Sequence, residues 1–378
     1  MVWKIARKII CIPLVLLTIC CIGAYLLAAL NPYMNTRGWW LISLAGLFYP
    51  ILFAALLLLI LPWLFINKRW ALVCGIVLVL GFRSALSTFA FHYFDRKTTD
   101  SRDQALTVMS YNIHEFKPVT GGRAHGKERF WDLIRTVNPD ILCLQEFDNS
   151  DIPRFMASGY LKLTEAALNM PHSYYSRDSY AFDSLVTHGT VILTRLPVLD
   201  SGKIKLTDNA VTTSVIYLDL LAGTDTIRVM TTHLKSFGFK KADYEDLHRI
   251  RHFQEGMSSS LSHILGRLRD VFLLQNQQAF RLHQAVKESP YPVILCGDFN
   301  SVPNSYPYFE TKGALQDAFL KKGKGMGSSY PRLSSTLRID YIFADPSFTI
   351  ASFDVRPELL SDHYPVVARI ILPGASGR

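Results

Sequence analysis

The sequence predicts a mixed α/β (α+β) globular domain preceded by about three transmembrane helices. Three observations support this prediction. The first 94 residues contain no acidic residue and are dominated by long apolar runs. After about residue 105, short β-like runs alternate with helical spacing without strict βαβ regularity, which favours mixed sheets. Several of those runs end in polar residues of the kinds that bind metal ions and phosphates.

The apolar region contains three runs that are long enough to cross a bilayer, for which about 20 residues are needed. They cover residues 10–30, 39–66 and 70–90, and the second has Trp near both ends, where an aromatic belt is expected. A cleaved signal peptide is an alternative for the first run alone. A buried soluble helix pair is a weaker alternative, because soluble helices normally keep a polar face.

Basic residues predict the orientation of these spans. Lys4, Arg7 and Lys8 precede the first run, Lys68-Arg69 separate the second from the third, and the loop between the first two has only Arg37. The positive-inside rule then places the N-terminus in the cytoplasm and, after three crossings, the rest of the chain outside it. We therefore expect a multi-pass protein of the cell (inner) membrane. Arg83, inside the third run, opposes this topology, because a charge within a span is costly.

The net charge of the chain does not indicate nucleic-acid binding. Seven of the 40 Lys and Arg residues lie in the first 94 residues, so the remaining 33 nearly balance the 31 acidic residues. The overall charge of +9 is therefore mostly a property of the apolar region. The six Cys residues have no metal-ligand or disulfide-framework spacing and are expected to be buried small side chains.

Three regions follow from these patterns: a transmembrane region (1–94), a polar linker (95–104) and a globular domain (105–378), which the motifs below identify as the expected catalytic domain. In the domain, strands are expected at 106–111, 141–144, 190–194, 211–220, 226–232, 291–295, 338–343 and 366–372. Helices are expected at 128–137, ended by Asn138-Pro139-Asp140, and at 242–288, with a break near 256–260.

Polar residues stand at the ends of several of these strands. They are Asn112, Glu146, His233, the pair Asp298 and Asn300 in Cys296-Gly297-Asp298-Phe299-Asn300, and Asp362-His363. Asp340 lies inside an apolar strand, where an unpaired carboxylate is costly and a His is a suitable partner. Each residue alone is as readily a turn or a solvated group, but together they predict one site.

The ordered motifs resemble the endonuclease/exonuclease/phosphatase family. They are Tyr111-Asn112, Gln145-Glu146, Thr232-His233-Leu234, Gly297-Asp298-Phe299-Asn300, Arg338-Ile339-Asp340-Tyr341-Ile342-Phe343 and Ser361-Asp362-His363-Tyr364-Pro365. The resemblance covers roughly residues 104–373. It implies a four-layer sandwich of two mixed β-sheets flanked by helices, and a divalent-metal-dependent phosphoesterase.

The resemblance also implies a role for each motif residue. Glu146, with Asn112 and Asp362 nearby, is expected at the metal; Asp298 and Asn300 position the attacking water and a phosphate oxygen; Asp340 orients His363, the general base; and His233 bonds the phosphoryl oxygens. Oxygen ligands favour Mg²⁺, with Mn²⁺ or Ca²⁺ as alternatives. Some nuclease members carry a Glu beside the strand that here reads His188-Gly189-Thr190-Val191, and this chain has none. The partner of His233 is therefore open.

The motifs leave the substrate open. The first hypothesis is a phosphodiesterase acting on a lipid or another envelope phosphoester, with the bilayer as its partner. The second is an extracytoplasmic nuclease, with Gly323-Lys324-Gly325 and Lys240-Lys241 contacting backbone phosphates. The third is a catalytically degenerate membrane scaffold. Tyr330 is expected among the substrate-binding residues, and Tyr174, Tyr175 and Phe237 are weaker candidates because packing is their more common role. No protein partner can be inferred.

Overall fold

The chain divides into two compact units, each built from separate stretches of sequence. The computed structural model describes residues 2–35, 39–92, 105–116, 123–150, 160–181, 186–208, 214–239, 241–332 and 334–373. The first unit comprises Met1–Thr88, Phe237–Asn276 and Val302–Phe309, and the second comprises Phe89–Ser236, Gln277–Ser301 and Glu310–Arg378. The predicted 95–104 linker lies outside the described residues, and the predicted domain boundaries stay predictions.

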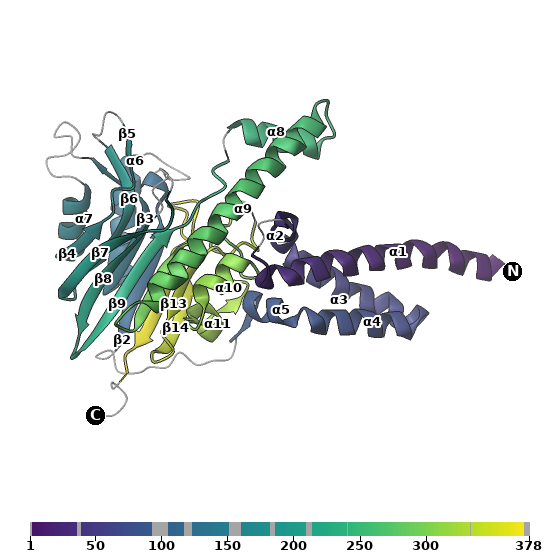
Figure 1. The fold of residues 1–378 in the computed structure, drawn as a ribbon, viewed down its shortest axis with the longest axis horizontal. Coiled ribbons are helices and arrows are strands. Elements are labelled where there is room, and N and C mark those ends of the chain that lie inside the picture. The colour runs from purple at the N-terminus through teal and green to yellow at the C-terminus, as the bar shows by residue number, and fades with distance from the viewer. Residues whose placement is uncertain are drawn as a thin grey trace. The chain divides into compact units, whose positions relative to one another are not determined.

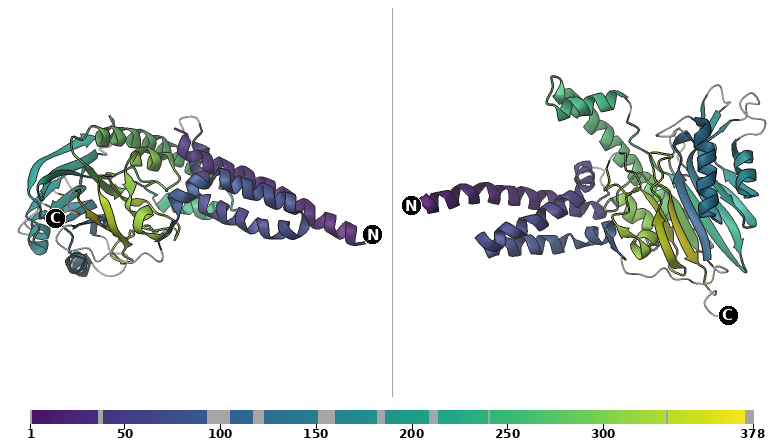
Figure 2. Two further views of the ribbon diagram at one scale, coloured as in Figure 1. Left: turned by 90° about the horizontal axis from the view of Figure 1, so that it is seen from below. Right: turned by 180° about the vertical axis from the view of Figure 1, so that it is seen from behind.

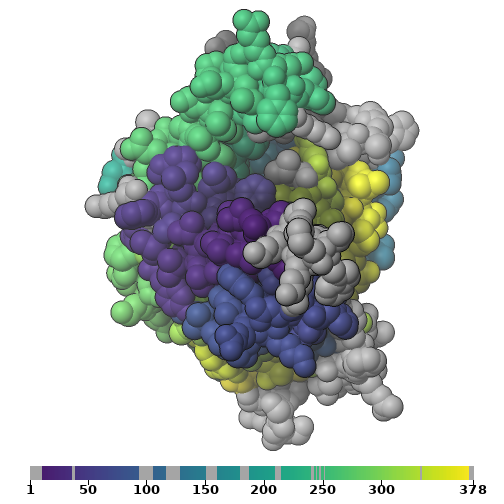
Figure 3. Space-filling view, turned by 90° about the vertical axis from the view of Figure 1, so that its right-hand side faces the viewer, coloured from purple at the N-terminus to yellow at the C-terminus, as the bar shows by residue number. Residues whose placement is uncertain are grey.

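The first unit is helical. Its elements are α1 (Val2–Leu30), the 3₁₀ helix η1 (Asn31–Tyr33), α2 (Trp40–Leu47), α3 (Tyr49–Ile66), α4 (Lys68–Leu80), α5 (Phe82–Thr88), α8 (Lys241–Arg251), most of α9 (Met257–Lys287) and the start of α10 (Tyr306–Lys312). By length and composition, the segments Cys11–Tyr33 and Tyr49–Ile66 are suited to cross a membrane. In Figure 3 the atoms of the first helices, purple to blue, pack against one another. Trp63 Nε1 donates to Thr18 Oγ1 at 2.9 Å across α3 and α1.

The second apolar run is not one helix, which corrects the predicted span of 39–66. It is divided at Phe48 into the eight-residue α2 and the longer α3. Pro50 lies in the first turn of α3, where proline is favoured because its missing N–H would have no helical partner. Only α3 is long enough to be a span, so α2 is outside that crossing.

The third apolar run bends at Gly81. Helices α4 and α5 meet there at 60°, so they make a third crossing only if the bent pair counts as one span. Tyr49 Oη donates to the Gly81 carbonyl at 2.9 Å, and a Cβ on Gly81 would lie 2.3 Å from Tyr25 Oη. Arg83 follows the bend, and its guanidinium lies 4.7 and 4.6 Å from the ring centres of Tyr33 and Phe309. The charge therefore lies in α5, outside the straight apolar helix α4, and has aromatic partners in η1 and α10.

The first half of α9 packs on α2. The buried residues Ile264, Leu268 and Phe272 form an apolar cluster with residues of α2, of the segment before α8 and of α8 itself: Trp40, Leu44, Leu47, Phe237, Phe239 and Ile250. These α9 positions are four residues apart and so lie on one helical face. The inserted segment 237–276 is thereby an integral part of the first unit.

The second unit contains two mixed β-sheets (Figure 1). The six-stranded sheet has the order β11 (Gln316–Asp317), β13 (Asp340–Ala344), β10 (Val293–Asp298), β9 (Asp225–His233), β8 (Ser214–Ala222), β7 (Val198–Lys205). The other has the order β14 (Thr349–Val355), β15 (Val366–Ile371), β2 (Ala105–Asn112), β3 (Ile141–Ser150), β6 (Val186–Thr194), β4 (His172–Tyr175), with β5 (Ser179–Ala181) also paired to β6. Two short strands, β1 (Ala90–Phe91) and β12 (Lys324–Gly325), pair with each other.

The sheets and helices of this unit form four layers, as predicted. The main apolar core lies between the sheets and joins residues of both, among them Val108, Ile141, Ile216, Val229 and Ile294. Helices α6 (Arg123–Val137) and α7 (Tyr160–Leu168) cover the outer face of the seven-stranded sheet, where Phe130, Ile134 and Leu168 join a second core (Figure 2). The last part of α9 contributes the buried residues Ala279, Leu282 and Ala285. Two short helices complete the unit: η3 (His114–Phe116) and α11 (Ala318–Lys322).

The predicted strands and helices are present with shifted ends. Helix α6 ends at Val137, before Asn138 in the left-handed conformation (φ 51°), and the long helical stretch breaks at 252–256 into α8 and α9. The predicted strand at 141–144 continues to Ser150, and residues 211–213 of another lie outside the described residues. Strands β4, β5, β7 and β14 were not predicted, because they are short or lack regular alternation of apolar residues.

Candidate active site

Strand register places three of the predicted residues side by side. In the parallel pair β9–β10, Asp298 is the partner of His233, and in the antiparallel pair β10–β13 it is the partner of Asp340. The residues that end β9 and β10 and the residue that begins β13 therefore lie side by side at the same end of the strands in the six-stranded sheet. Gly297 makes this pairing possible: its φ is 142°, and a Cβ there would lie 2.1 Å from the carbonyl oxygen of Thr232.

The second sheet contributes Asn112 and Glu146. Strands β2 and β3 run parallel, and the pairing of β3 with β6 shifts between Leu144 and Phe147, which is a β-bulge. At the bulge Glu146 has a positive φ of 52°. Gln145 is fully buried and donates to Thr231 Oγ1 at 3.0 Å, joining the two sheets. The bulge thus allows consecutive side chains to take different roles, one in the core and one in the site.

The Ser361-Asp362-His363 segment closes the site. Ser361 Oγ donates to the carbonyl oxygen of Asn112 at 2.8 Å, which fixes this loop to the end of β2. His363 Nδ1 lies 2.9 Å from Asp340 Oδ2, and both side chains are buried. The carboxylate therefore holds the imidazole with its Nε2 atom free to exchange a proton.

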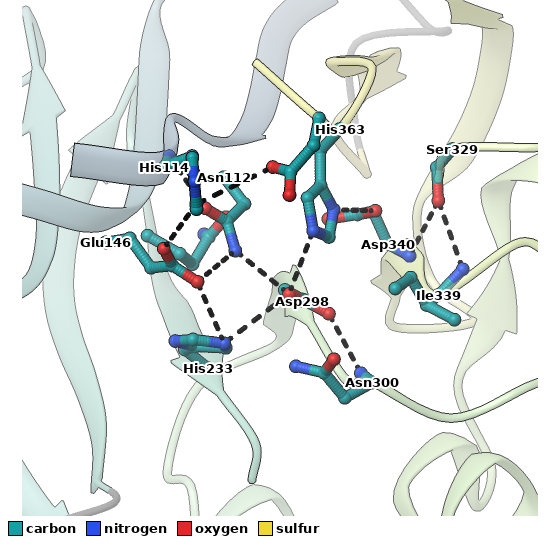
Figure 4. A network of polar contacts seen from close by, with 12 residues as sticks. Asn112, His114, Glu146, His233, Asp298, Asn300, Ser329, Ile339, Asp340 and His363 are labelled. Carbon is teal, nitrogen blue, oxygen red and sulfur yellow. Dashed lines mark hydrogen bonds and ion pairs between the residues drawn. The ribbon is translucent and has the colours of Figure 1, made fainter. Parts of the chain in front are cut away.

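Hydrogen bonds connect these residues into one network (Figure 4). The Asn112 amide donates to Glu146 at 3.1 Å and to Asp298 at 3.0 Å, so one side chain bridges two carboxylates from different sheets. His233 Nε2 lies 3.5 Å from Asp298 Oδ2 and 3.7 Å from Glu146 Oε1. These two carboxylates are the charged neighbours of His233, whose partner the sequence left open. His363 Nε2 is 3.7 Å from Asp298 Oδ2.

The environment shifts three pKa values in this network. Burial raises the pKa of Asp298 to about 6, with Asp340 adding to the rise and His363 opposing it. Burial alone would lower the pKa of His363, but the charges of Asp340 and Asp298 outweigh it and raise that pKa to about 10. Burial likewise opposes ionisation of Glu146, but the hydrogen bond with His114 and the electrostatic interaction with His233 outweigh it and lower the pKa of Glu146 to about 2.

The donor set fits a divalent cation. Ligand-type atoms of Asp298, Asp340 and His363 lie within 4.8 Å of one another. Two buried atoms of the network, Asp340 Oδ1 and His233 Nε2, make no hydrogen bond. Carboxylate oxygens dominate the site and suit hard cations, whereas the Asn112 amide turns its nitrogen to two of these carboxylates and its oxygen to the His114 N–H. The residues present therefore match the requirement of a metal-dependent hydrolase.

The structure brings the remaining predicted residues to the site to different degrees. Asn300 follows β10 in the left-handed conformation (φ 49°), and its amide donates to the Leu234 carbonyl at 3.1 Å. The ring of Tyr330 lies 4.7 Å from that of His363. Asp362 is buried, and its Oδ1 lies 3.8 Å from His114 Nδ1.

Other candidates lie elsewhere. Tyr174 packs on the main core and Tyr175 on the second core, while Phe237 packs edge-on against Phe272 in the first unit. The lysine of Gly323-Lys324-Gly325 begins β12, which pairs with β1. Lys240 and the side chain of Lys241 lie outside the described residues. The structure thus assigns packing roles to these aromatic residues.

Three residues of the site were not predicted. His114 Nδ1 lies 3.3 Å from Glu146 Oε2, and Arg332 donates to Asp362 Oδ2 at 3.4 Å. Ser329 Oγ accepts from the backbone N–H groups of Ile339 and Asp340, both at 3.1 Å. The proximity of His114 to Asn112 in sequence was a usable signal, whereas Arg332 and Ser329 belong to a loop with no recognisable pattern.

Comparisons with known proteins agree with this geometry. The sequence pattern of the Endonuclease/Exonuclease/phosphatase family matches residues 109–363, and that of a domain of unknown function matches residues 7–88. A search of curated proteins finds no match. The crystal structure of an endonuclease/exonuclease/phosphatase from Beutenbergia cavernae DSM 12333 is similar, with 20% identity, 72% of each chain covered and a TM-score of 0.53. The human Nocturnin catalytic domain with bound sulfate shares 18% identity, covering 72% of this chain and 95% of that chain, with a TM-score of 0.50.

The fold and the matched pattern define a metal-dependent phosphoester hydrolase. The chain belongs to the endonuclease/exonuclease/phosphatase family.

Proposed function

We propose that this protein is a membrane-anchored phosphodiesterase that uses Mg²⁺ to hydrolyse a lipid or another envelope phosphoester. The observation that carries the proposal is the buried Asp340–His363 pair, whose imidazole faces Asp298 beside the carboxylate of Glu146. Such a pair is a general base held in one orientation, next to groups that suit a cation. The two apolar helices in the same chain support a substrate at the membrane.

In this proposal each residue has a defined task. Glu146, Asn112 and Asp362 hold the cation, which when bound neutralises negative charge on the phosphoryl oxygens. His363 Nε2 accepts a proton from water as the water oxygen forms a bond to phosphorus, and the opposite ester P–O bond breaks in line. The leaving alkoxide takes up a proton. His233 and Asn300 donate hydrogen bonds to the phosphoryl oxygens, and Asp298 orients the water.

The protonation of His363 is consistent with a cation requirement. The carboxylates Asp340 and Asp298 raise the pKa of His363 to about 10, so without a compensating charge the imidazole is protonated at neutral pH. Only neutral imidazole accepts a proton from water. A cation held by the neighbouring oxygens offsets the same negative charges and favours the neutral form.

A paired assay on the full-length chain in detergent tests the proposal. The protein is given Mg²⁺ or Mn²⁺ and is offered plasmid DNA and phospholipid micelles in parallel, with folded His363→Ala protein as the control for contaminating hydrolases. We expect phosphate ester cleavage in the lipid arm that the control lacks. DNA cleavage that the control lacks would instead establish a nuclease. Absence of turnover together with no Mg²⁺ or Mn²⁺ binding at millimolar concentration would establish a scaffold.

The proposed orientation has its own test. The distribution of basic residues predicts that residue 100 lies outside the cytoplasm. An alkaline phosphatase fused after residue 100 is then expected to be active in cells, because that enzyme requires an oxidising compartment for its disulfides. An inactive but stably produced fusion would overturn the orientation.

A further inference from the structure

The loop before β13 places one aromatic and one basic side chain against the catalytic motif. The ring of Tyr330 packs on that of His363, with the centres 4.7 Å apart. Two residues later, Arg332 donates to Asp362 Oδ2 at 3.4 Å. Pro331 and Arg332 lie in a turn, and the proline ring restricts the backbone between the two side chains. The segment Tyr330-Pro331-Arg332 therefore runs alongside Asp362 and His363.

Backbone hydrogen bonds hold this loop on both sides. The Ser329 and Tyr330 N–H groups donate to the carbonyl oxygen of Leu337 at 2.9 and 3.1 Å, and Tyr364 N donates to the Ser329 carbonyl at 2.7 Å. Ser329 Oγ also accepts from two N–H groups at the start of β13. Because the same contacts join the loop to Asp340 and to the residue after His363, the two side chains are held relative to the catalytic pair.

The guanidinium of Arg332 differs from the other charged groups of the network. Its side chain is 55% exposed, whereas that of Asp362, its partner, is 8% exposed. The long 3.4 Å contact occupies one nitrogen of a group that carries five N–H donors. Among the described residues of the site, carboxylates and imidazoles surround the catalytic centre, and this guanidinium supplies a permanent positive charge at its accessible side. Arginine binds phosphate oxygens with two parallel hydrogen bonds, which lysine does not.

We infer that Tyr330 and Arg332 form a subsite for a second phosphate group on the substrate, next to the ester that is cleaved. This inference rests on the proposed phosphoesterase function and narrows its substrate class to phosphodiesters that carry a further phosphate. Arg332 binds that phosphate, and the Tyr330 ring covers the part of the substrate between the two groups. A second phosphate can come from a polyphosphorylated lipid headgroup or from a nucleotide terminus, and both offer the same oxygens.

Two substrate pairs that differ by one phosphate test the inference with the full-length protein in detergent at saturating Mg²⁺. The lipid pair is phosphatidylinositol and phosphatidylinositol 4-phosphate, and the nucleotide pair is the dithymidine dinucleotide without and with a terminal phosphate. We expect Arg332→Ala to lower kcat/KM for the member of the active pair that carries two phosphate groups about tenfold to a hundredfold, and for the other member less than about threefold. Arg332→Lys should recover part of the loss.

The controls separate this subsite from a structural role. Arg135 on α6 is a matched control, since it is 51% exposed and pairs with Asp132 at 2.9 Å, and Arg135→Ala should change neither member. An equal loss on both members of a pair, or no loss, in the Arg332→Ala protein would overturn the inference. If the wild-type protein cleaves neither pair, the proposed function fails instead. The subsite is then tested by measuring binding of the same ligands to the His363→Ala protein. Adding Arg332→Ala to that protein must weaken binding only of the ligand that carries two phosphate groups.

Discussion

Replacing Asp340 by asparagine tests the assignment of the general base. The change keeps the size of a side chain that is 1% exposed and removes its charge. In the structure Asp340 Oδ2 lies 2.9 Å from His363 Nδ1 and accepts the proton that this nitrogen carries. An asparagine amide can donate to the same nitrogen, which moves the ring proton to Nε2. The imidazole then has no lone pair facing the water and cannot accept its proton.

The expected magnitude follows from this change of tautomer. The pair is buried, so water cannot replace the hydrogen bond that is lost. The new hydrogen bond from the asparagine amide to the imidazole then holds the ring in the tautomer that cannot accept a proton from water. A comparable Asp→Asn change in a hydrolase His–Asp pair costs about 10⁴ in kcat. General-base catalysis as a whole contributes about 10²–10⁴. We therefore expect kcat to fall about 10²–10⁴-fold, which corresponds to about 3–5 kcal/mol of activation free energy.

The assay is hydrolysis of the active substrate by full-length protein in detergent, measured as kcat and KM over a range of pH. Removing the negative charge of Asp340 also removes one cause of the raised pKa of His363. The residual activity should therefore persist to lower pH than in the wild-type protein, which loss of folding would not produce. Asp225→Asn is the matched control, because Asp225 is exposed at the start of β9.

A folded Asp340→Asn protein with kcat within threefold of the wild-type value would refute the reasoning. So would a large fall in kcat with an unchanged pH profile, because the charge of Asp340 would then have no effect on the catalytic base. Thermal unfolding measured for each variant shows whether the folded state is retained.

The other predictions concern the metal, the pH and the stability of the fold. Glu146→Gln should weaken Mn²⁺ binding about tenfold or more in titration calorimetry, because it removes a carboxylate charge; equal affinity would exclude Glu146 as a ligand. In EDTA, the melting temperature should fall as the pH rises from about 6.5 to about 10. The pKa of His363 is raised to about 10 in the folded protein, so its stabilisation is complete below its unfolded pKa and lost above its folded one; His363→Gln should lack this decline. Asp317→Ala should lower the free energy of unfolding by about 3–5 kcal/mol, because it leaves the fully buried Arg338 without its 2.7 Å carboxylate partner; a urea denaturation difference under about 1 kcal/mol would contradict it.

Much of the site could be predicted from sequence because its residues stand at strand ends. Asn112, Asp298 and His233 end strand-like runs, and the register of β9, β10 and β13 brings Asp298 and His233 beside Asp340. The sequence signal for His114 is weaker, since it consists only of its proximity to Asn112. The His114 side chain reaches Glu146 because His114 begins a 3₁₀ turn shortly after Asn112 and has a positive φ of 46°. Patterns of apolar and polar side chains do not reveal that backbone conformation.

The helical region was predicted less well in its details. Hydropathy shows only how long an apolar run is. Residues 39–66 and 70–90 are both long enough to cross a bilayer, yet the helices are interrupted at Phe48 and Gly81. Each break depends on packing: Gly81 lets Tyr25 approach the backbone, and α2 has a partner in α9. The apolar face of α9 shows helical periodicity in the sequence, but periodicity does not say which distant segment covers that face.

The first unit is assembled from segments that are far apart in the sequence, and this has a consequence for its biogenesis. Trp40, Leu44 and Leu47 are synthesised early, but their partners Ile264, Leu268 and Phe272 are translated only after eight of the thirteen strands of the two sheets have been made. Until then the face formed by Trp40, Leu44 and Leu47 lacks these three partners. Release from the ribosome before residue 276 would leave that face incomplete even though every apolar helix of the N-terminal region is present. Truncated products are therefore expected to be substrates for quality-control proteases rather than stable fragments.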